Sequence, residues 1–126
     1  PEHVCLNHPP VVIDCLEFSA ELRQVDPFDE LAFLGLECTI AGVAWVAQRL
    51  VDGVGAALDD RPPDALVHLY AANRAALRAR LAVAHLQDPQ PRTPERWLPL
   101  GRRYLAQAAS ALDALDALDR AADAHE

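Results

Sequence analysis

Clusters of proline interrupt this chain at three places and leave long stretches with few prolines between them. The clusters fall at residues 7–10, 59–63 and 88–94. Because proline has no amide hydrogen and its ring clashes with the preceding helical turn, a regular helix ends at or before such a cluster. The stretches between them are rich in alanine and leucine, which favour helices. The sequence therefore predicts a mainly α protein with a bundle of about four helices.

Local signals set the expected helix ends. Asp26 precedes Pro27, and Asp29 and Glu30 follow in the first turn, which is typical of a helix start. This helix should run over residues 27–41, before Gly42, and its few polar residues predict that it is the most buried one. Further helices are expected over residues 44–58, 64–86 and 99–122. The last is expected to begin at Pro99, since a proline disturbs a continuous helix.

Apolar residues recur at helical spacing in the two longest predicted helices. We expect these rows to face the core. In residues 64–86 the row is Leu66, Leu69 or Tyr70, Asn73, Leu77, Leu81 and Ala84. In residues 99–122 it is Tyr104, Leu105, Ala108, Leu112, Leu115 and Leu118. The Ala-Leu-Asp repeat within residues 111–119 is interpreted as helix with a solvated acidic face.

Two short extended segments precede the helices. Residues 4–6 and 11–14 flank a turn that contains Asn7 and two prolines, which predicts a β-hairpin. Because two strands alone are marginal in water, this hairpin should lie against the helices. The expected organisation is a hairpin over residues 1–18 and a helical subdomain over residues 26–126. Cys5 and Cys15 could approach each other across the hairpin, and free thiols are the preferred interpretation.

Composition excludes several classes of function. The net charge is −8 and all eleven basic residues are arginine, which argues against binding a nucleic-acid backbone. The longest uncharged run in the middle of the chain is too short to cross a bilayer, and no secretory signal is visible. Three cysteines without Cys-x-x-Cys spacing make a zinc site a poor expectation and favour reduced thiols in a cytoplasmic protein. The first residues are already strand-like and no methionine occurs, so we expect a piece of a longer protein.

Asp14 is the strongest candidate for chemistry. It ends the apolar run Val11-Val12-Ile13, and a carboxylate at the end of a buried strand is well placed to hold a divalent cation. An acid that merely caps a strand beside water gives the same pattern. Glu17 follows one turn later and would either approach the same cation or hold an arginine such as Arg23.

The order of segments resembles the aminoglycoside phosphotransferase-like family, which has the protein-kinase-like fold. The resemblance is carried by residues 1–6 (PEHVCL), 12–18 (VIDCLEF) and 23–34 (RQVDPFDELAFL), and it extends more loosely through Leu66, Tyr70, Arg74, Arg78, Arg80 and residues 103–105. It is closest to bacterial members that are sometimes joined to a P-loop ATPase domain. It implies that the chain is the C-terminal lobe of such a kinase.

The resemblance also implies a set of site residues. Asp14 matches the acid that bridges Mg²⁺ to the phosphates of ATP. The metal-binding Asn of the family falls on His3, a departure, because imidazole prefers softer cations than Mg²⁺. The metal and nucleotide residues expected here are therefore His3, Asp14 and Glu17. The catalytic Asp would stand three residues before Pro1, outside this chain.

The remaining polar residues have structural interpretations. Asp26 and Glu30 match acids that open the buried helix of the family, and their physical role is capping and favourable charge at a helix start. The arginines Arg74, Arg78 and Arg80 are expected to pair with acids on neighbouring helices rather than to line an acidic-substrate pocket. The histidines are isolated from one another, which argues against their being metal ligands: His8, His68, His85 and His125.

The predicted function is that of a fragment of an ATP-dependent phosphotransferase. In the intact protein the γ-phosphoryl group of ATP would pass to a hydroxyl of a small molecule. The chain contains no lysine to grip the phosphates, so it should be inactive alone. Its expected partners are the N-terminal lobe of the same protein, ATP, the hydroxyl acceptor and, through exposed apolar surface, a second copy. The alternatives are a non-catalytic helical binding or regulatory module and an unrelated helical bundle.

Overall fold

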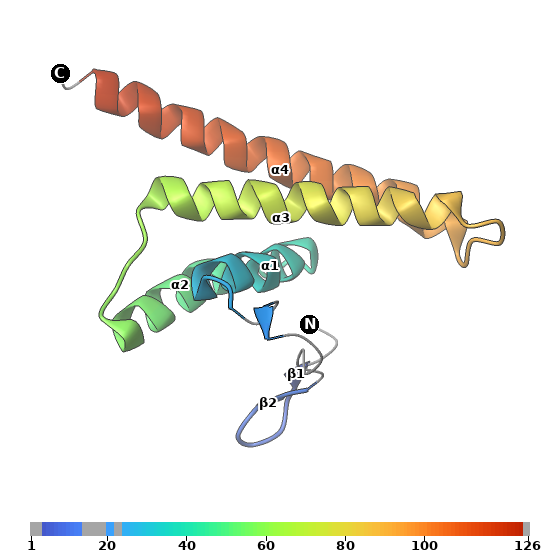
Figure 1. Cartoon of the computed structure of the whole chain (residues 1–126), viewed down its shortest axis with the longest axis horizontal. Helices are drawn as coiled ribbons and strands as arrows, with labels where there is room; N and C mark the ends of the chain where they lie inside the picture. The colour runs from blue at the N-terminus through green and yellow to red at the C-terminus, as the bar shows by residue number, and fades with distance from the viewer. Residues whose placement is uncertain (1–3, 14–19, 22–23, 125–126) are drawn as a thin grey trace.

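Four helices make up most of the protein, as the sequence predicts. The structure is a computed structural model, and it describes residues 4–13, 20–21 and 24–124. The helices are α1 (Pro27–Ile40), α2 (Trp45–Leu58), α3 (Asp64–Ala84) and α4 (Pro94–Asp123), with a 3₁₀ turn η2 (His85–Gln87) between the last two. In Figure 1, α3 and α4 run side by side as the longest elements, and α1 and α2 lie on the other side of α3.

Two strands of two residues each precede the helices. Strand β1 (Val4–Cys5) pairs antiparallel with β2 (Val11–Val12), so that Val4 lies opposite Val12 and Cys5 opposite Val11. The side chains of Leu6, Val11 and Ile13 are 90%, 44% and 49% exposed. This ribbon therefore gains little from burial in the described residues, although the sequence predicts that it lies against the helices. Cys5 is a free thiol, and Cys15 lies outside the described residues.

Helix α1 begins where the sequence predicts and has the fewest exposed residues of the four. The Asp26 side chain accepts a hydrogen bond of 2.8 Å from the Phe28 amide, and Pro27 occupies the first helical position. Only Pro27 and Glu30 of this helix are exposed. Gly35 allows α2 to approach closely, since a Cβ there would lie 2.8 Å from the Cβ of Ala47.

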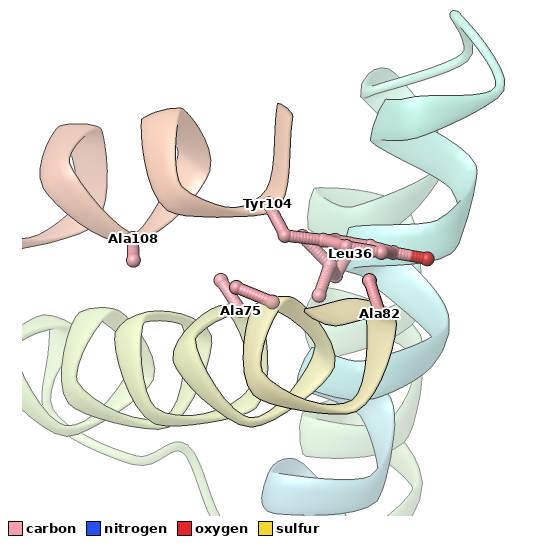
Figure 2. Packing of buried hydrophobic residues seen from close by; sticks show 6 residues of the cluster. Leu36, Ala75, Ala82, Tyr104 and Ala108 are labelled. Atoms are coloured by element: carbon pink, nitrogen blue, oxygen red, sulfur yellow. The ribbon is translucent and has the colours of Figure 1, made fainter. Parts of the chain in front are cut away.

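The core lies mainly between α3 and α4 and is built from small side chains. Figure 2 shows Ala82 of α3 next to the ring of Tyr104, Ala75 of α3 between Tyr104 and Ala108, and Leu36 of α1 beside the ring. Ala75 is completely buried and Tyr104 is 2% exposed. Since alanine allows two helix backbones to come close together, one aromatic ring and a row of methyl groups fill the space between them.

The predicted leucine rows do not form this core. The buried residues of α3 are Ala72, Ala75, Ala79 and Ala82, whereas Leu69, Leu77 and Leu81 are 49%, 38% and 43% exposed. In α4, Tyr104 and Ala108 are buried as predicted, but Leu105, Leu112 and Leu118 are 55%, 48% and 37% exposed. The prediction is wrong because helical spacing alone does not show which side of a helix a neighbouring helix approaches most closely. Close helix packing instead selects the alanines.

Helix α4 begins at Pro94, five residues before the predicted start, and Pro99 lies inside it. Contacts from outside the helix hold this first part in place. The Trp97 indole stacks on His85, with ring centroids 4.1 Å apart, and donates a 2.7 Å hydrogen bond to the Arg92 carbonyl. Trp97 and Leu100 also pack on the core. These contacts offset the one helical hydrogen bond that Pro99 cannot donate. Helix α3 correspondingly ends at Ala84, and Leu86 falls in η2.

Among the residues that the structure describes, no helix combines the length and the apolar character needed to cross a membrane.

Candidate functional site

The residues predicted to hold Mg²⁺ and ATP lie outside the described part of the chain. His3, Asp14 and Glu17 all belong to the undescribed residues 1–3 and 14–19. The carboxylates of Asp14 and Glu17 are hard oxygen donors of the kind that suits Mg²⁺, whereas the imidazole of His3 is not. Within residues 4–13, 20–21 and 24–124, no group of three or more His, Cys, Asp or Glu side chains could hold a metal ion.

The described polar groups instead gather between α1 and α3. Three residues of α3 spaced by four, Tyr70, Arg74 and Arg78, form a row on one side of the helix. Each contacts acids at or in α1: Asp26 at its N-cap, Asp29 and Glu30 in its first turn, and Glu37 near its end. We call these seven residues, together with Tyr104 of α4, the polar clamp.

Arg74 is the most heavily bonded residue of the polar clamp. Its Nε and Nη2 donate bonds of 2.7 Å each to the two carboxylate oxygens of Asp29, and Nη2 also contacts Glu30 at 2.7 Å. The side chains of Arg74 and Asp29 are only 19% and 20% exposed. A two-pronged ion pair that is partly shielded from water is stronger and more directional than a surface pair. It therefore fixes the start of α1 against the middle of α3.

A second group in the polar clamp joins three helices. The Tyr104 hydroxyl donates a 2.8 Å hydrogen bond to Glu37 and accepts one of 3.2 Å from Arg78, whose Nε also bonds Glu37 at 2.9 Å. In Figure 2 the Tyr104 side chain leaves α4 and its oxygen lies at the far end of the ring. The Arg78 guanidinium lies 5.3 Å from the centre of that ring and 5.4 Å from that of Phe33. One carboxylate thus organises α1, α3 and α4 together.

These contacts change the proton affinities of the groups in them. The hydrogen bond to Asp26 raises the pKa of Tyr70, and the hydrogen bond to Asp29 raises that of Arg74. Burial raises the pKa of Tyr104, and its bond to Glu37 adds to this, while Arg78 opposes it. For Arg78, burial lowers the pKa, but the hydrogen bond with Tyr104 and the charge of Glu37 outweigh it and the pKa is raised.

The polar clamp has the chemistry of a structural element. Its charged groups bond one another, and every buried side-chain nitrogen and oxygen in the described residues has a hydrogen-bond partner. Neither Glu37 nor Asp29 is therefore free to act as a general base without losing its arginine. The expectation that Arg74 and Arg78 pair with acids of a neighbouring helix is confirmed. Arg80 instead lines a hollow of about 490 Å³ beside α4.

A separate hollow of about 520 Å³ lies at the end of α2. Asp52, Asp59, Asp60 and Arg61 line it together with Val51, Gly55 and Ala56. Arg61 lies 3.3 Å from Asp52 and 4.0 Å from Asp64, with its side chain 59% exposed. Such exposed pairs are weak, so the hollow has no firmly positioned charge with which to select a ligand.

Sequence reasoning missed two members of the polar clamp. The sequence assigns Glu37 no site role, and it places Tyr104 in the apolar row of the last helix and in the looser part of the family resemblance. The four-residue spacing of Tyr70, Arg74 and Arg78 was the available indication that a polar row faces a neighbour. No local pattern indicates that Tyr104, which is 67 residues from Glu37 in the chain, completes it.

Comparisons with known proteins give distant relatives. No protein-family model matches the chain, and no solved structure matches it. The chain is 32% identical over 82 residues to the uncharacterized protein Mb2027c of Mycobacterium bovis and to the uncharacterized proteins MT2060 and Rv2004c of Mycobacterium tuberculosis. The match covers 65% of this chain and 16% of each relative. The chain thus corresponds to a small part of these longer proteins.

Proposed function

We propose that this chain is the helical C-terminal lobe of an aminoglycoside phosphotransferase-like kinase, which in the intact protein transfers the γ-phosphoryl group of ATP to a hydroxyl of a small molecule. One observation carries the proposal. A pair of short antiparallel strands ends at Val12, two residues before Asp14, and a capped, enclosed helix follows at Pro27. This is the order of elements that the resemblance in residues 12–34 requires.

In this proposal the carboxylates of Asp14 and Glu17 would hold Mg²⁺. His3, at the position of the family's metal-binding Asn, would be a poor ligand for it. The bound cation would neutralise charge on the phosphates during transfer. The contribution of the described residues is positional. The polar clamp fixes α1 on α3. The acceptor would bind over the helical lobe.

The test uses the intact protein that contains this chain. Titration with Mg²⁺ and ATP should show saturable nucleotide binding, and Asp14→Asn should reduce turnover by at least about a hundredfold, since the residue would act on the transition-state charge. Asp113→Asn on the exposed side of α4 is the matched control and should leave turnover unchanged. If nucleotide binding and turnover are unchanged in Asp14→Asn, Asp14 is not the Mg²⁺ ligand proposed here.

A non-catalytic helical module is the second candidate. The observation that favours it is the complete pairing of the charged groups in the polar clamp, which leaves that part of the chain without a free acid or base. An intact protein that is folded, by circular dichroism, and binds no ATP at millimolar Mg²⁺ would support this candidate over the kinase.

A further inference from the structure

One side of α4 carries a mostly apolar row that the other described residues leave uncovered. We call it the outer stripe, and its members are Leu98, Arg102, Leu105, Ala109, Leu112 and Asp116. They alternate in steps of four and three residues, the spacing of a helix that packs along a second helix. All six are exposed, and the three leucines are 47%, 55% and 48% exposed.

The outer stripe is distinct from the face that packs on α3. That inner face consists of Gly101, Tyr104 and Ala108, which are buried. Figure 1 shows α4 at the edge of the molecule, diverging from α3 toward its C-terminal end. Leu105 also lines a hollow of about 490 Å³, whose other lining residues belong to α3 and η2 and include Arg80 and Gln87.

Charge along the outer stripe is arranged asymmetrically. Arg102 lies in the first half of α4 and Asp116 in the second half. Helix α4 runs from Pro94 to Asp123, so its centre falls between Ala108 and Ala109. Consider a second, identical helix that lies antiparallel to α4 and is related to it by a two-fold axis through this centre. Leu105 of one helix then lies opposite Leu112 of the other. Arg102 lies opposite residue 115, one position from Asp116. The parallel arrangement would place like charges opposite each other.

We propose that the outer stripe binds the outer stripe of a second copy of this chain, with the two α4 helices antiparallel and the two-fold axis near Ala109. Leu105 of each copy packs against Leu112 of the other, and Arg102 of each pairs with Asp116 of the other. The small side chain of Ala109 lets the helices come close at the axis. The pairing of Arg102 with Asp116 favours the antiparallel arrangement, and the parallel arrangement would place Arg102 opposite Arg102 and Asp116 opposite Asp116. The proposal does not depend on the proposed kinase function.

Sedimentation velocity of the 126-residue chain over a range of concentrations tests the association. The wild type should shift from monomer to dimer as concentration rises. Arg102→Glu and Asp116→Arg, each alone, should weaken the dimer at least about tenfold, because each places like charges opposite each other. The double variant Arg102→Glu with Asp116→Arg should restore the wild-type dissociation constant to within about threefold, which is the expected result for two residues in direct contact.

The matched control is Arg49→Glu, the same charge change on the exposed side of α2. It should dimerise as the wild type does. Because every substituted residue is exposed, circular dichroism should report unchanged helix content in all of these variants. A wild type that is monomeric up to about 100 µM, a dimer that Arg102→Glu leaves unchanged, or a double variant no better than the singles would overturn the proposal.

Disulfide trapping tests the direction of the helices. In a background with serine in place of the three native cysteines, Leu98→Cys and Asp119→Cys are expressed separately and mixed under mild oxidation. Residues 98 and 119 are equally far from the centre of α4, so the antiparallel dimer predicts a mixed product. Products of Leu98→Cys with itself in place of the mixed one would mean a parallel dimer and overturn the arrangement.

Discussion

Helix α3 is held on its two sides by different physical means. Toward α1 it presents Tyr70, Arg74 and Arg78, which bond acids directly. Toward α4 it presents alanines, which stabilise by close packing and the release of water. Charged contacts are directional and fix which part of α1 meets which part of α3, whereas alanine rows tolerate sliding. The ring of Tyr104 belongs to both sides, because its carbon atoms pack on the alanines and its hydroxyl bonds Glu37.

The largest effect should come from Tyr104→Ala. Removing this buried ring leaves a cavity in the alanine-lined core and also leaves Glu37 and Arg78 without one bond each. We expect the free energy of unfolding to fall by about 3–5 kcal/mol. Urea denaturation followed by circular dichroism measures it. Tyr104→Phe keeps the ring and should lose only about 1 kcal/mol. Equal losses in the two variants would mean that the hydroxyl, and not the packing, dominates.

Arg74→Met should have the next largest effect. Methionine keeps an unbranched apolar stem but leaves Asp29 without its partner in a partly buried site, so we expect a loss of about 2 kcal/mol. The control is Arg61→Met, whose side chain is 59% exposed and whose loss should stay below about 1 kcal/mol. The difference between the two variants should shrink in high salt if charge is its source. A loss at Arg74 no greater than at Arg61 would contradict the role given to the polar clamp.

Two glycines distinguish the packing of α1 from that of α4. A Cβ at Gly35 would lie 2.8 Å from the Cβ of Ala47, whereas the nearest atom to a Cβ at Gly101 is 3.6 Å away, an ordinary contact. Gly35→Ala should therefore destabilise by about 1–2 kcal/mol. Gly101→Ala should stabilise by about 0.5–1 kcal/mol through helix propensity. Thermal unfolding should therefore show a lower melting temperature for Gly35→Ala and a higher one for Gly101→Ala. A stabilising Gly35→Ala would mean that α1 and α2 are farther apart than described.

The smallest effect is a dependence of stability on pH. Burial and the bond to Glu37 raise the pKa of Tyr104 in the folded protein. A raised pKa means that the protonated hydroxyl is favoured by folding, so its contribution is fully present below the unfolded value of about 10 and is lost as pH rises through the folded value. Denaturant midpoints measured from pH 8 upward should fall above about pH 10, and less steeply in Tyr104→Phe. Identical slopes would show that the ionisation of Tyr104 is not linked to folding.

The parts of the fold that the sequence predicts well depend on local chemistry. The predicted start of α1 is confirmed, because the Asp26 side chain caps the first amides of the helix and Pro27 fits its first position. The predicted breaks near residues 59–63 and 88–94 are also confirmed, because proline disrupts the helical turn in which it lies. The pairing of Arg74 and Arg78 with acids is confirmed because an acidic chain offers them many partners. Asp14, Glu17 and His3 stay predictions, since they lie outside the described residues.

The failures depend on distant contacts. Whether α3 buries Leu77 or Ala75 depends on how closely α4 approaches, and no local pattern contains that distance. Likewise, α4 continues through Pro99 because Trp97 is held by His85 and Arg92, residues outside the helix. In both cases the local preference is weaker than the packing of a neighbouring element.

The stack of Trp97 on His85 gives the protein an internal optical reporter. The chain has two tryptophans, and the other, Trp45, is 68% exposed at the start of α2. If the corner between α3 and α4 opens, only Trp97 exchanges a packed environment for water, while the emission of Trp45 hardly changes. A shift of fluorescence to longer wavelength in a Trp45→Phe variant would therefore follow the separation of these two helices in real time, independently of what happens at α1.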